Sequence, residues 1–115
     1  PKDYDDHGLS LRAGRRERHH ARARTICDAL MAETPGEITF AVNRKLLAGG
    51  VTASDEEVGA AMAFAFRELK LVVEPGGAVG LAALLCGRLD VRGKTVVIVL
   101  SGGNVDAELF SRLIA

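Results

Sequence analysis

An unbroken apolar run near the end of the chain constrains its fold more than any other feature. Residues 95–100 read Thr-Val-Val-Ile-Val-Leu, without alternation of polar and apolar side chains. β-Branched residues at this density predict a strand. A strand without a polar side must be covered on both faces. The run therefore predicts a parallel sheet with helices on either side.

The rest of the pattern alternates helices with short extended pieces. Thr34, followed by Pro35 and Glu37, is typical of a helix N-cap, and Ser54 opens a second capping box. The expected helices span 35–48, 55–70, 78–85 and 106–114, and the expected strands 71–74 and 95–100. The 78–85 helix has only apolar residues and glycine, so we expect it to be buried all round. This order indicates an open α/β sheet.

The first 24 residues differ from the remainder. An acidic stretch over residues 3–6 precedes six arginines between positions 12 and 24, namely Arg12, Arg15, Arg16, Arg18, Arg22 and Arg24. Neither part has an apolar period, so residues 1–24 are interpreted as an irregular segment, with at most one helical turn near 9–13. Residues 25–115 form the folded part.

Composition narrows the classes of function. The formal net charge is zero, and we find no apolar run of about 18 residues that would cross a membrane. Cys27 and Cys86 are too few for a disulfide framework or a metal cluster. Reduced thiols favour a cytoplasmic protein.

Two glycine-containing turns are the candidate binding sites. Ligands of open parallel sheets bind beyond the carboxyl ends of the strands, where Glu74-Pro-Gly-Gly and Ser101-Gly-Gly-Asn are expected. Glycines let the backbone approach a planar ring or an anion closely. The alternative is that these glycines only make tight turns between strand and helix.

Three motifs in this order resemble one known family. They are Thr25-Ile-Cys-Asp-Ala29, Lys70-Leu-Val-Val-Glu-Pro-Gly-Gly-Ala78 and Val99-Leu-Ser-Gly-Gly-Asn-Val-Asp106. They are similar to the C-terminal third of threonine dehydratases and serine racemases, pyridoxal-phosphate enzymes of fold type II, the tryptophan-synthase-β-like fold. The resemblance implies a three-layer open, mostly parallel sheet with helices on both faces. Residues 25–115 would be the C-terminal part of the large cofactor-binding domain.

The resemblance also implies cofactor contacts. Ser101 would place its hydroxyl against the pyridine nitrogen, while Gly102, Gly103 and Asn104 would shape the turn around the ring. A neutral hydroxyl cannot hold a proton on that nitrogen, which suits β-elimination of water. Glu74 would lie near the ring; the alternative is a carboxylate that caps the helix after Pro75.

A partial metal site is implied at the N-terminus. Many members bind a divalent cation through a glutamate, a backbone carbonyl and an aspartate. Here Tyr4 would give the carbonyl and Asp6 the carboxylate, whereas the glutamate would precede Pro1. Two protein ligands make a weak Mg²⁺ or Ca²⁺ site. The alternative is a solvated acidic loop.

The family's Schiff-base lysine has no match here. It lies in a serine-phenylalanine-lysine motif, and Lys45, Lys70 and Lys94 stand in other contexts. We therefore expect no catalytic residue in this chain, which would be an inactive fragment by itself. The parent would be a homo-oligomeric dehydratase that converts L-threonine or L-serine to a 2-oxo acid and ammonia. Serine racemisation is the close alternative, because both reactions deprotonate Cα.

Two further interpretations stay open. The arginine-rich segment could bind nucleic-acid phosphates, although no aromatic platform accompanies it. The chain could also be a docking module, because an exposed sheet edge favours association with the remainder of the catalytic domain or with other chains.

Overall fold

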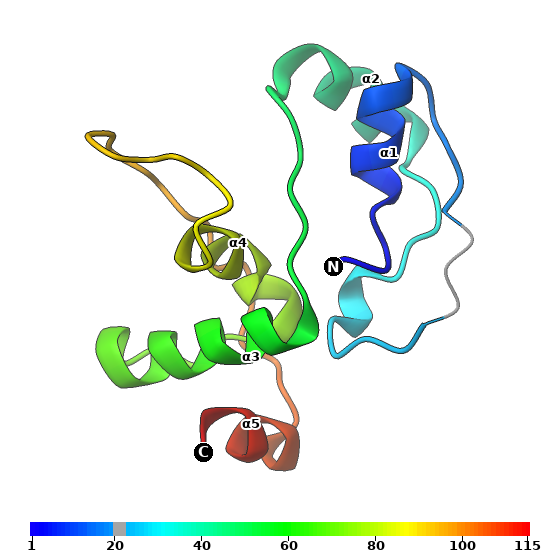
Figure 1. The fold of residues 1–115 in the computed structure, drawn as a ribbon. Helices are drawn as coiled ribbons and strands as arrows, with labels where there is room; N and C mark the ends of the chain where they lie inside the picture. The colour runs from blue at the N-terminus through cyan, green and yellow to red at the C-terminus, as the bar shows by residue number, and fades with distance from the viewer. Residues whose placement is uncertain (20–22) are drawn as a thin grey trace.

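The computed structural model describes residues 1–19 and 23–115 (Figure 1). Within this part all regular elements are helical. They are α1 (Asp6–Ala13), the 3₁₀ turn η1 (Asp28–Leu30), α2 (Glu37–Leu46), α3 (Asp55–Phe64), the π-helical turn η2 (Ala65–Leu69), α4 (Pro75–Leu85) and α5 (Ala107–Ile114).

The core lies where α3 packs against α4 on one side and α5 on the other. Figure 1 shows these three helices together, while α1 and α2 form a second group reached through the long segment 47–54. The buried cluster comprises Cys27, Ala53, Val58, Ala61, Met62, Ala65, Val73, Ala78, Leu81 and Ala82. Small residues dominate this cluster, so the backbones of α3 and α4 can approach closely.

The start of α3 confirms the predicted capping box. The Ser54 hydroxyl accepts from the Glu57 amide at 3.3 Å, and Glu57 Oε2 accepts from the Ser54 amide at 2.8 Å. Two amides at the helix start are thereby satisfied by local side chains. The predicted helix over 55–70 continues as η2 and ends at Lys70, which is left-handed at φ 60°.

Helix α4 begins three residues before the expected start at 78. Pro75 occupies its first turn, where the missing amide hydrogen leaves no bond unmade. The prediction that residues 78–85 are buried all round was wrong, since Gly80 is exposed and Leu85 is 47% exposed. Pro75, Gly77, Ala78, Leu81, Ala82 and Ala83 are buried.

The 95–100 run is not a strand in the described structure. Ile98 and Leu100 pack against the core, whereas Val97 and Val99 are 85% and 75% exposed. The run therefore has one covered face and one open face, and the described residues contain no sheet to cover the second. In residues 71–74, Val73 is buried, while Leu71 and Val72 are exposed.

The N-terminal segment is more regular than expected, because α1 occupies eight of its residues. Tertiary contacts explain a helix that the apolar pattern did not reveal. His7 Nε2 lies 3.0 Å from Asn43 Nδ2, and its ring meets Phe40 edge-on at 6.1 Å. The Ser10 hydroxyl, which is buried, donates to Asp6 O at 2.7 Å.

Helix α2 starts later than predicted. The sequence pattern placed the N-cap at Thr34, but the N-cap in the structure is Gly36. The Pro35 carbonyl accepts a hydrogen bond from Arg16 Nε at 2.7 Å. The N-terminal segment therefore holds Pro35 in place before the helix begins. Arg16 Nη1 pairs with Glu37 at 3.1 Å as well. A contact across about twenty residues thus fixes this boundary.

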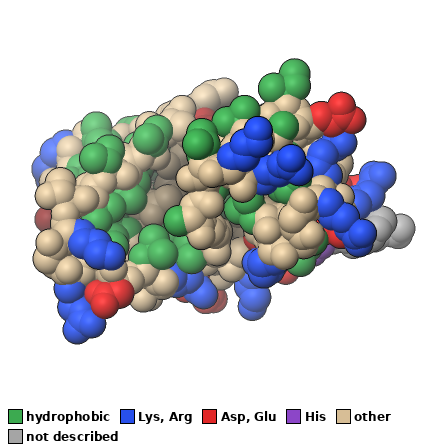
Figure 2. Space-filling view, turned by 90° about the horizontal axis from the view of Figure 1, so that it is seen from above, with side chains coloured by type: hydrophobic (Ala, Val, Ile, Leu, Met, Phe, Trp, Pro, Cys, Tyr) green, Lys and Arg blue, Asp and Glu red, His purple; other side chains and the backbone are tan. Residues whose placement is uncertain are grey.

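Carboxylates pair with four arginines of the basic segment. The pairs are Arg12–Asp5, Arg15–Glu17, Arg16–Glu37 and Arg18–Glu33. Basic side chains gather at the right-hand end of the face shown in Figure 2. Arg22 and His20 lie outside the described residues. The pairing reduces the charge available for phosphates, against the nucleic-acid interpretation.

None of the helices in the described part of the chain is long and apolar enough to span a bilayer.

Candidate functional site

The Ser101-Gly-Gly-Asn turn lies directly before α5 and is fixed through its backbone. Gly102 O accepts from the Glu74 amide at 2.9 Å, and Gly103 O accepts from the Val105 amide at 3.1 Å. Asp106 then caps α5 by accepting from the Leu109 amide at 2.8 Å. The two turns selected from the sequence are therefore in direct contact.

Glu74 connects these turns with its side chain as well. It is the N-cap residue of α4, but its carboxylate makes no cap hydrogen bond. Oε2 instead accepts from the Asn104 amide at 3.1 Å. The carboxylate thus lies at the N-terminus of α4, as the helix-capping alternative has it, but its hydrogen bond goes to the neighbouring turn and not to the helix.

The glycines of the turn stand where a side chain would collide. A Cβ on Gly102 would lie 2.7 Å from the Glu74 carboxyl carbon, and one on Gly103 would lie 2.9 Å from Val72 O. A Cβ on Gly77 would lie 3.0 Å from the Gly102 amide nitrogen. Close approach of another backbone explains glycine at positions 77 and 103, whereas at position 102 the close neighbour is the Glu74 carboxylate.

Ser101 presents an unused hydroxyl at this turn. The residue is exposed, and its side chain makes no hydrogen bond to any residue of the described ranges. The hydroxyl is thus available on a turn whose backbone is held by Glu74 and Val105. It is suited to one directional hydrogen bond with a ligand.

A cavity of about 490 Å³ lies elsewhere, between α1, η1 and α2. Tyr4 and Asp6 are among its lining residues, whereas Glu74 and residues 101–104 are not. The predicted site residues thus fall into two separate groups. Within the first group, the Tyr4 ring is buried and its hydroxyl donates to Ala23 O at 3.0 Å.

The described residues contain no group of three or more His, Cys, Asp or Glu side chains that could hold a metal ion. Asp5, beside Asp6, is already paired with Arg12 at 2.8 Å. The Tyr4 carbonyl and the Asp6 carboxylate therefore offer two oxygens, fewer than a hard cation prefers.

Comparison with known proteins decides the family. Residues 1–102 match the family described as pyridoxal-phosphate dependent enzyme. The chain belongs to this family. Its resemblance to threonine dehydratases and serine racemases, inferred from the three motifs, is confirmed.

Relatives of this pyridoxal-phosphate family are similar over most of the chain. The L-threonine ammonia-lyase of Thermotoga maritima is 42% identical over 105 residues, which are 91% of this chain and 26% of the relative. The L-threo-3-hydroxyaspartate ammonia-lyase of Saccharomyces cerevisiae is 38% identical over 84% of this chain and 30% of its own length. The chain spans roughly a quarter to a third of these relatives.

Solved structures of the family share the fold. The threonine deaminase of T.th. superposes with a TM-score of 0.83 at 40% identity, over 92% of this chain and 38% of the other. Maize serine racemase gives 0.85 at 33% identity, over 97% of this chain and 36% of the other. These structures are fold type II enzymes, in agreement with the predicted α/β class.

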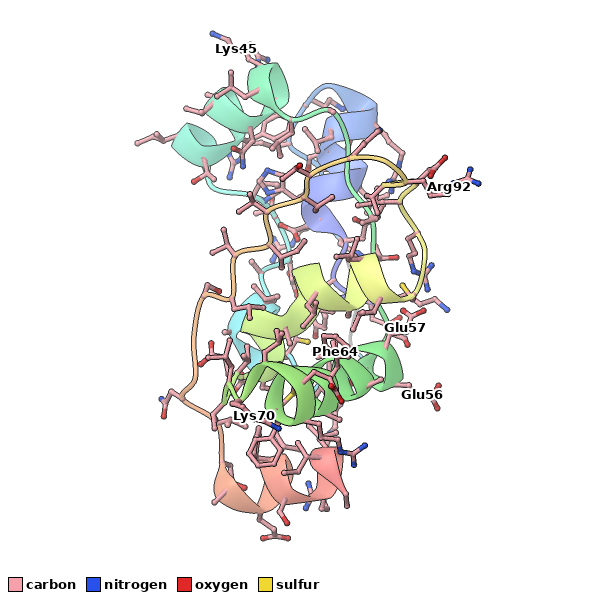
Figure 3. All side chains as sticks on the ribbon, turned by 90° about the vertical axis from the view of Figure 1, so that its left-hand side faces the viewer. Lys45, Glu56, Glu57, Phe64, Lys70 and Arg92 are labelled. Atoms are coloured by element: carbon pink, nitrogen blue, oxygen red, sulfur yellow. The ribbon has the colours of Figure 1, made fainter. Side chains whose placement is uncertain are left out.

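The lysines of this family member are dispersed. Figure 3 shows Lys45 at the far end of α2 and Lys70 in the lower part of the molecule, near α5. Lys70 Nζ donates to Arg67 O at 2.5 Å, within its own turn.

Sequence analysis missed one contact near the site. The pattern places Asp55 only in the Ser54 capping box, but its carboxylate accepts from Thr25 Oγ1 at 2.6 Å and from the Ile26 amide at 2.9 Å. Thr25 and Ile26 precede Cys27, whose thiol pKa is raised chiefly by burial. The pattern has no local signal for a hydrogen bond across 30 positions.

Proposed function

We propose that this chain is the C-terminal part of the large domain of a pyridoxal-phosphate-dependent L-threonine/L-serine ammonia-lyase. The observation that carries the proposal is the Ser101 turn, which Glu74 holds from a second segment while the Ser101 hydroxyl stays free. The printed functions of the relatives support the reaction: L-threonine ammonia-lyase and L-threonine dehydratase.

The residues present fit the pyridine edge of the cofactor. When bound, pyridoxal phosphate supplies an electron-withdrawing ring that stabilises negative charge at the substrate Cα. Ser101 would donate its hydroxyl hydrogen to the ring nitrogen. Gly102, Gly103 and Asn104 would form the wall beside the ring, and Glu74 would keep that wall in place. Because the Ser101 hydroxyl is neutral, it would not hold a proton on the ring nitrogen, an arrangement that would suit loss of the β-hydroxyl.

The open face of the 95–100 run supports the predicted sheet in the intact enzyme. Val97 and Val99 on this run, together with Leu71 and Val72, expose apolar surface that water solvates poorly. We propose that parallel neighbours from the remainder of the catalytic domain cover this face. The three-layer arrangement would then be completed by residues outside this chain.

Serine racemisation remains the second candidate, because serine racemases are among the structural neighbours. Both reactions begin with removal of the Cα proton, so the Ser101 turn serves either. A weak Mg²⁺ or Ca²⁺ site at the Tyr4 carbonyl and Asp6 belongs to this proposal as well.

The proposal extends to the substrate, assembly and location of the parent enzyme and to the role of its basic segment. Its substrate would be a small hydroxy amino acid, and its assembly a homo-oligomer. A cytoplasmic location is supported by the two free cysteines. The paired arginines favour a structural role for the basic segment over nucleic-acid binding.

Product analysis of the full-length protein tests the reaction. With pyridoxal phosphate and L-threonine we expect 2-oxobutanoate and ammonia in equal amounts, and pyruvate and ammonia from L-serine. D-Serine as the main product from L-serine would favour the racemase. Absence of all these products would overturn both candidates.

A further inference from the structure

A hydrogen-bonded clamp joins the start of α3 to the segment that leads into η1. One carboxylate, that of Asp55, accepts from the Thr25 hydroxyl at 2.6 Å and from the Ile26 amide at 2.9 Å. Hydrogen bonds to an ionised acceptor are roughly twice as strong as neutral ones. Asp55 also lies in the first turn of α3, where the helix dipole favours its negative charge.

The clamp extends into η1 through Thr25. The Thr25 hydroxyl oxygen also accepts from the Cys27 amide at 3.1 Å, and Cys27 is completely buried. The Cys27 carbonyl then accepts from the Leu30 amide at 2.9 Å, which closes the 3₁₀ turn. A shift of Thr25 would therefore move the whole turn.

η1 rests on the N-terminus of α4. A Cβ on Gly76 would lie 3.5 Å from Leu30 Cγ and 3.6 Å from Ala29 Cβ. The next residue, Gly77, faces the Ser101 turn, where a Cβ would lie 3.0 Å from the Gly102 amide nitrogen. The start of α4 is thus held between η1 and the turn at 101–104.

We infer that Asp55 is a positioning residue for the turn at 101–104, acting through Thr25 and η1. This inference rests on the proposed function of that turn as the cofactor site. Without the clamp, the segment before η1 keeps its apolar contacts through Cys27 but loses its hydrogen bonds to α3, so the start of α4 moves away from Gly102 more easily. The hydrogen bond from the Glu74 amide to Gly102 O would then open more often, and the ring-facing wall would lose its fixed geometry.

Three variants of the full-length protein separate positioning from simple stability. Thr25→Val removes the hydroxyl but keeps the shape, and Thr25→Ser restores it. Ser54→Ala is the matched control, because it weakens the start of the same helix without touching residues 25–30. Two measurements apply to each variant: the Kd for pyridoxal phosphate by absorbance titration, and the exchange rate of the Glu74 amide hydrogen in cofactor-free protein.

We expect Thr25→Val to raise the Kd by roughly tenfold or more and to accelerate exchange at Glu74, because it removes two hydrogen bonds, the one donated to Asp55 and the one accepted from the Cys27 amide. Thr25→Ser should restore both values, and Ser54→Ala should leave both near wild type despite a lower melting temperature. If Thr25→Val does not fold, Asp55→Asn should show a smaller change in the same direction, because the amide keeps only one acceptor.

Two results would count against this inference, and they differ in meaning. If wild type binds pyridoxal phosphate but the Thr25→Val and Ser54→Ala variants give the same Kd and exchange rate, only the positioning role is overturned. If wild type does not bind the cofactor, the proposed function fails, and the inference fails with it.

Discussion

Ser101 is the residue on which the cofactor assignment depends most directly. In the full-length enzyme Ser101→Ala would leave the ring nitrogen without a partner, at a cost of about 1–3 kcal/mol. We therefore expect weaker binding of pyridoxal phosphate in a spectral titration, with lower turnover. Ser101→Thr is the control, because it keeps the hydroxyl. Wild-type affinity in Ser101→Ala would reduce Ser101 to a turn residue.

At this scale, sequence patterns identified residues whose partners are local or whose motif is shared with a family. Glu74 and Ser101 were selected in this way, and the structure brings their turns into contact. The hydrogen bond from the Asn104 amide to the Glu74 carboxylate was not predictable, since the two residues are 30 positions apart. Asp55 was missed for the same reason: its first partner, Thr25, lies equally far along the chain.

Among the elements, α3 offers a test through its capping box. The Ser54 amide, and next Arg88, lower the pKa of Glu57 from its ordinary value. The folded pKa is depressed, so this stabilisation is present above the unfolded pKa, about 4.3, and is lost as the pH falls through the folded pKa. When the pH is lowered from neutral to acid, the free energy of unfolding of Glu57→Gln should therefore fall less than that of wild type.

Unfolding in urea at a series of pH values measures this difference. Glu56→Gln provides the control, because Glu56 is an exposed neighbour on the same turn. The stability gap between wild type and Glu57→Gln should narrow in acid, while the Glu56→Gln profile follows wild type. Parallel profiles for all three proteins would show that Glu57 does not act through its charge.

The 95–100 run tests the proposed sheet. In the full-length enzyme, Val97→Asp should place an unpaired charge between sheet and helices and destabilise the fold by about 4 kcal/mol or more. Val97→Thr, of similar shape, should cost much less. If Val97→Asp changes the free energy of unfolding by only about 0.5 kcal/mol, as at an ordinary surface position, the face is open in the enzyme too.

Element boundaries followed from sequence where local chemistry sets them. Ser54 at α3 was identified through a capping box, a signal that operates within four residues. Boundaries set by distant contacts were missed. Helix α2 starts late because Arg16 binds Pro35 O, and α1 exists through His7 and its contacts with α2. The predicted strand over 95–100 would need neighbours that residues 1–19 and 23–115 do not supply in this structure.

For the molecule as a whole, the exposed apolar faces and the family membership both support a cofactor site that this chain shares with the remainder of the enzyme. We propose that the site is divided between this chain and the remainder of the enzyme: the ring-facing turn would lie here, and the covalent anchor of the cofactor would lie elsewhere. Fold class and family followed from three short motifs, whereas the layout of the sheet did not, because strands form only when their partners are present.

Borohydride reduction followed by mass spectrometry tests this division most directly. The full-length protein and residues 1–115 are each incubated with pyridoxal phosphate, reduced and digested. We expect one stoichiometric pyridoxyl-lysine adduct in the full-length protein, at a lysine outside residues 1–115, and no stoichiometric adduct in the chain alone. A stoichiometric adduct on Lys45, Lys70 or Lys94 would contradict this account, because the anchoring lysine would then lie within this chain.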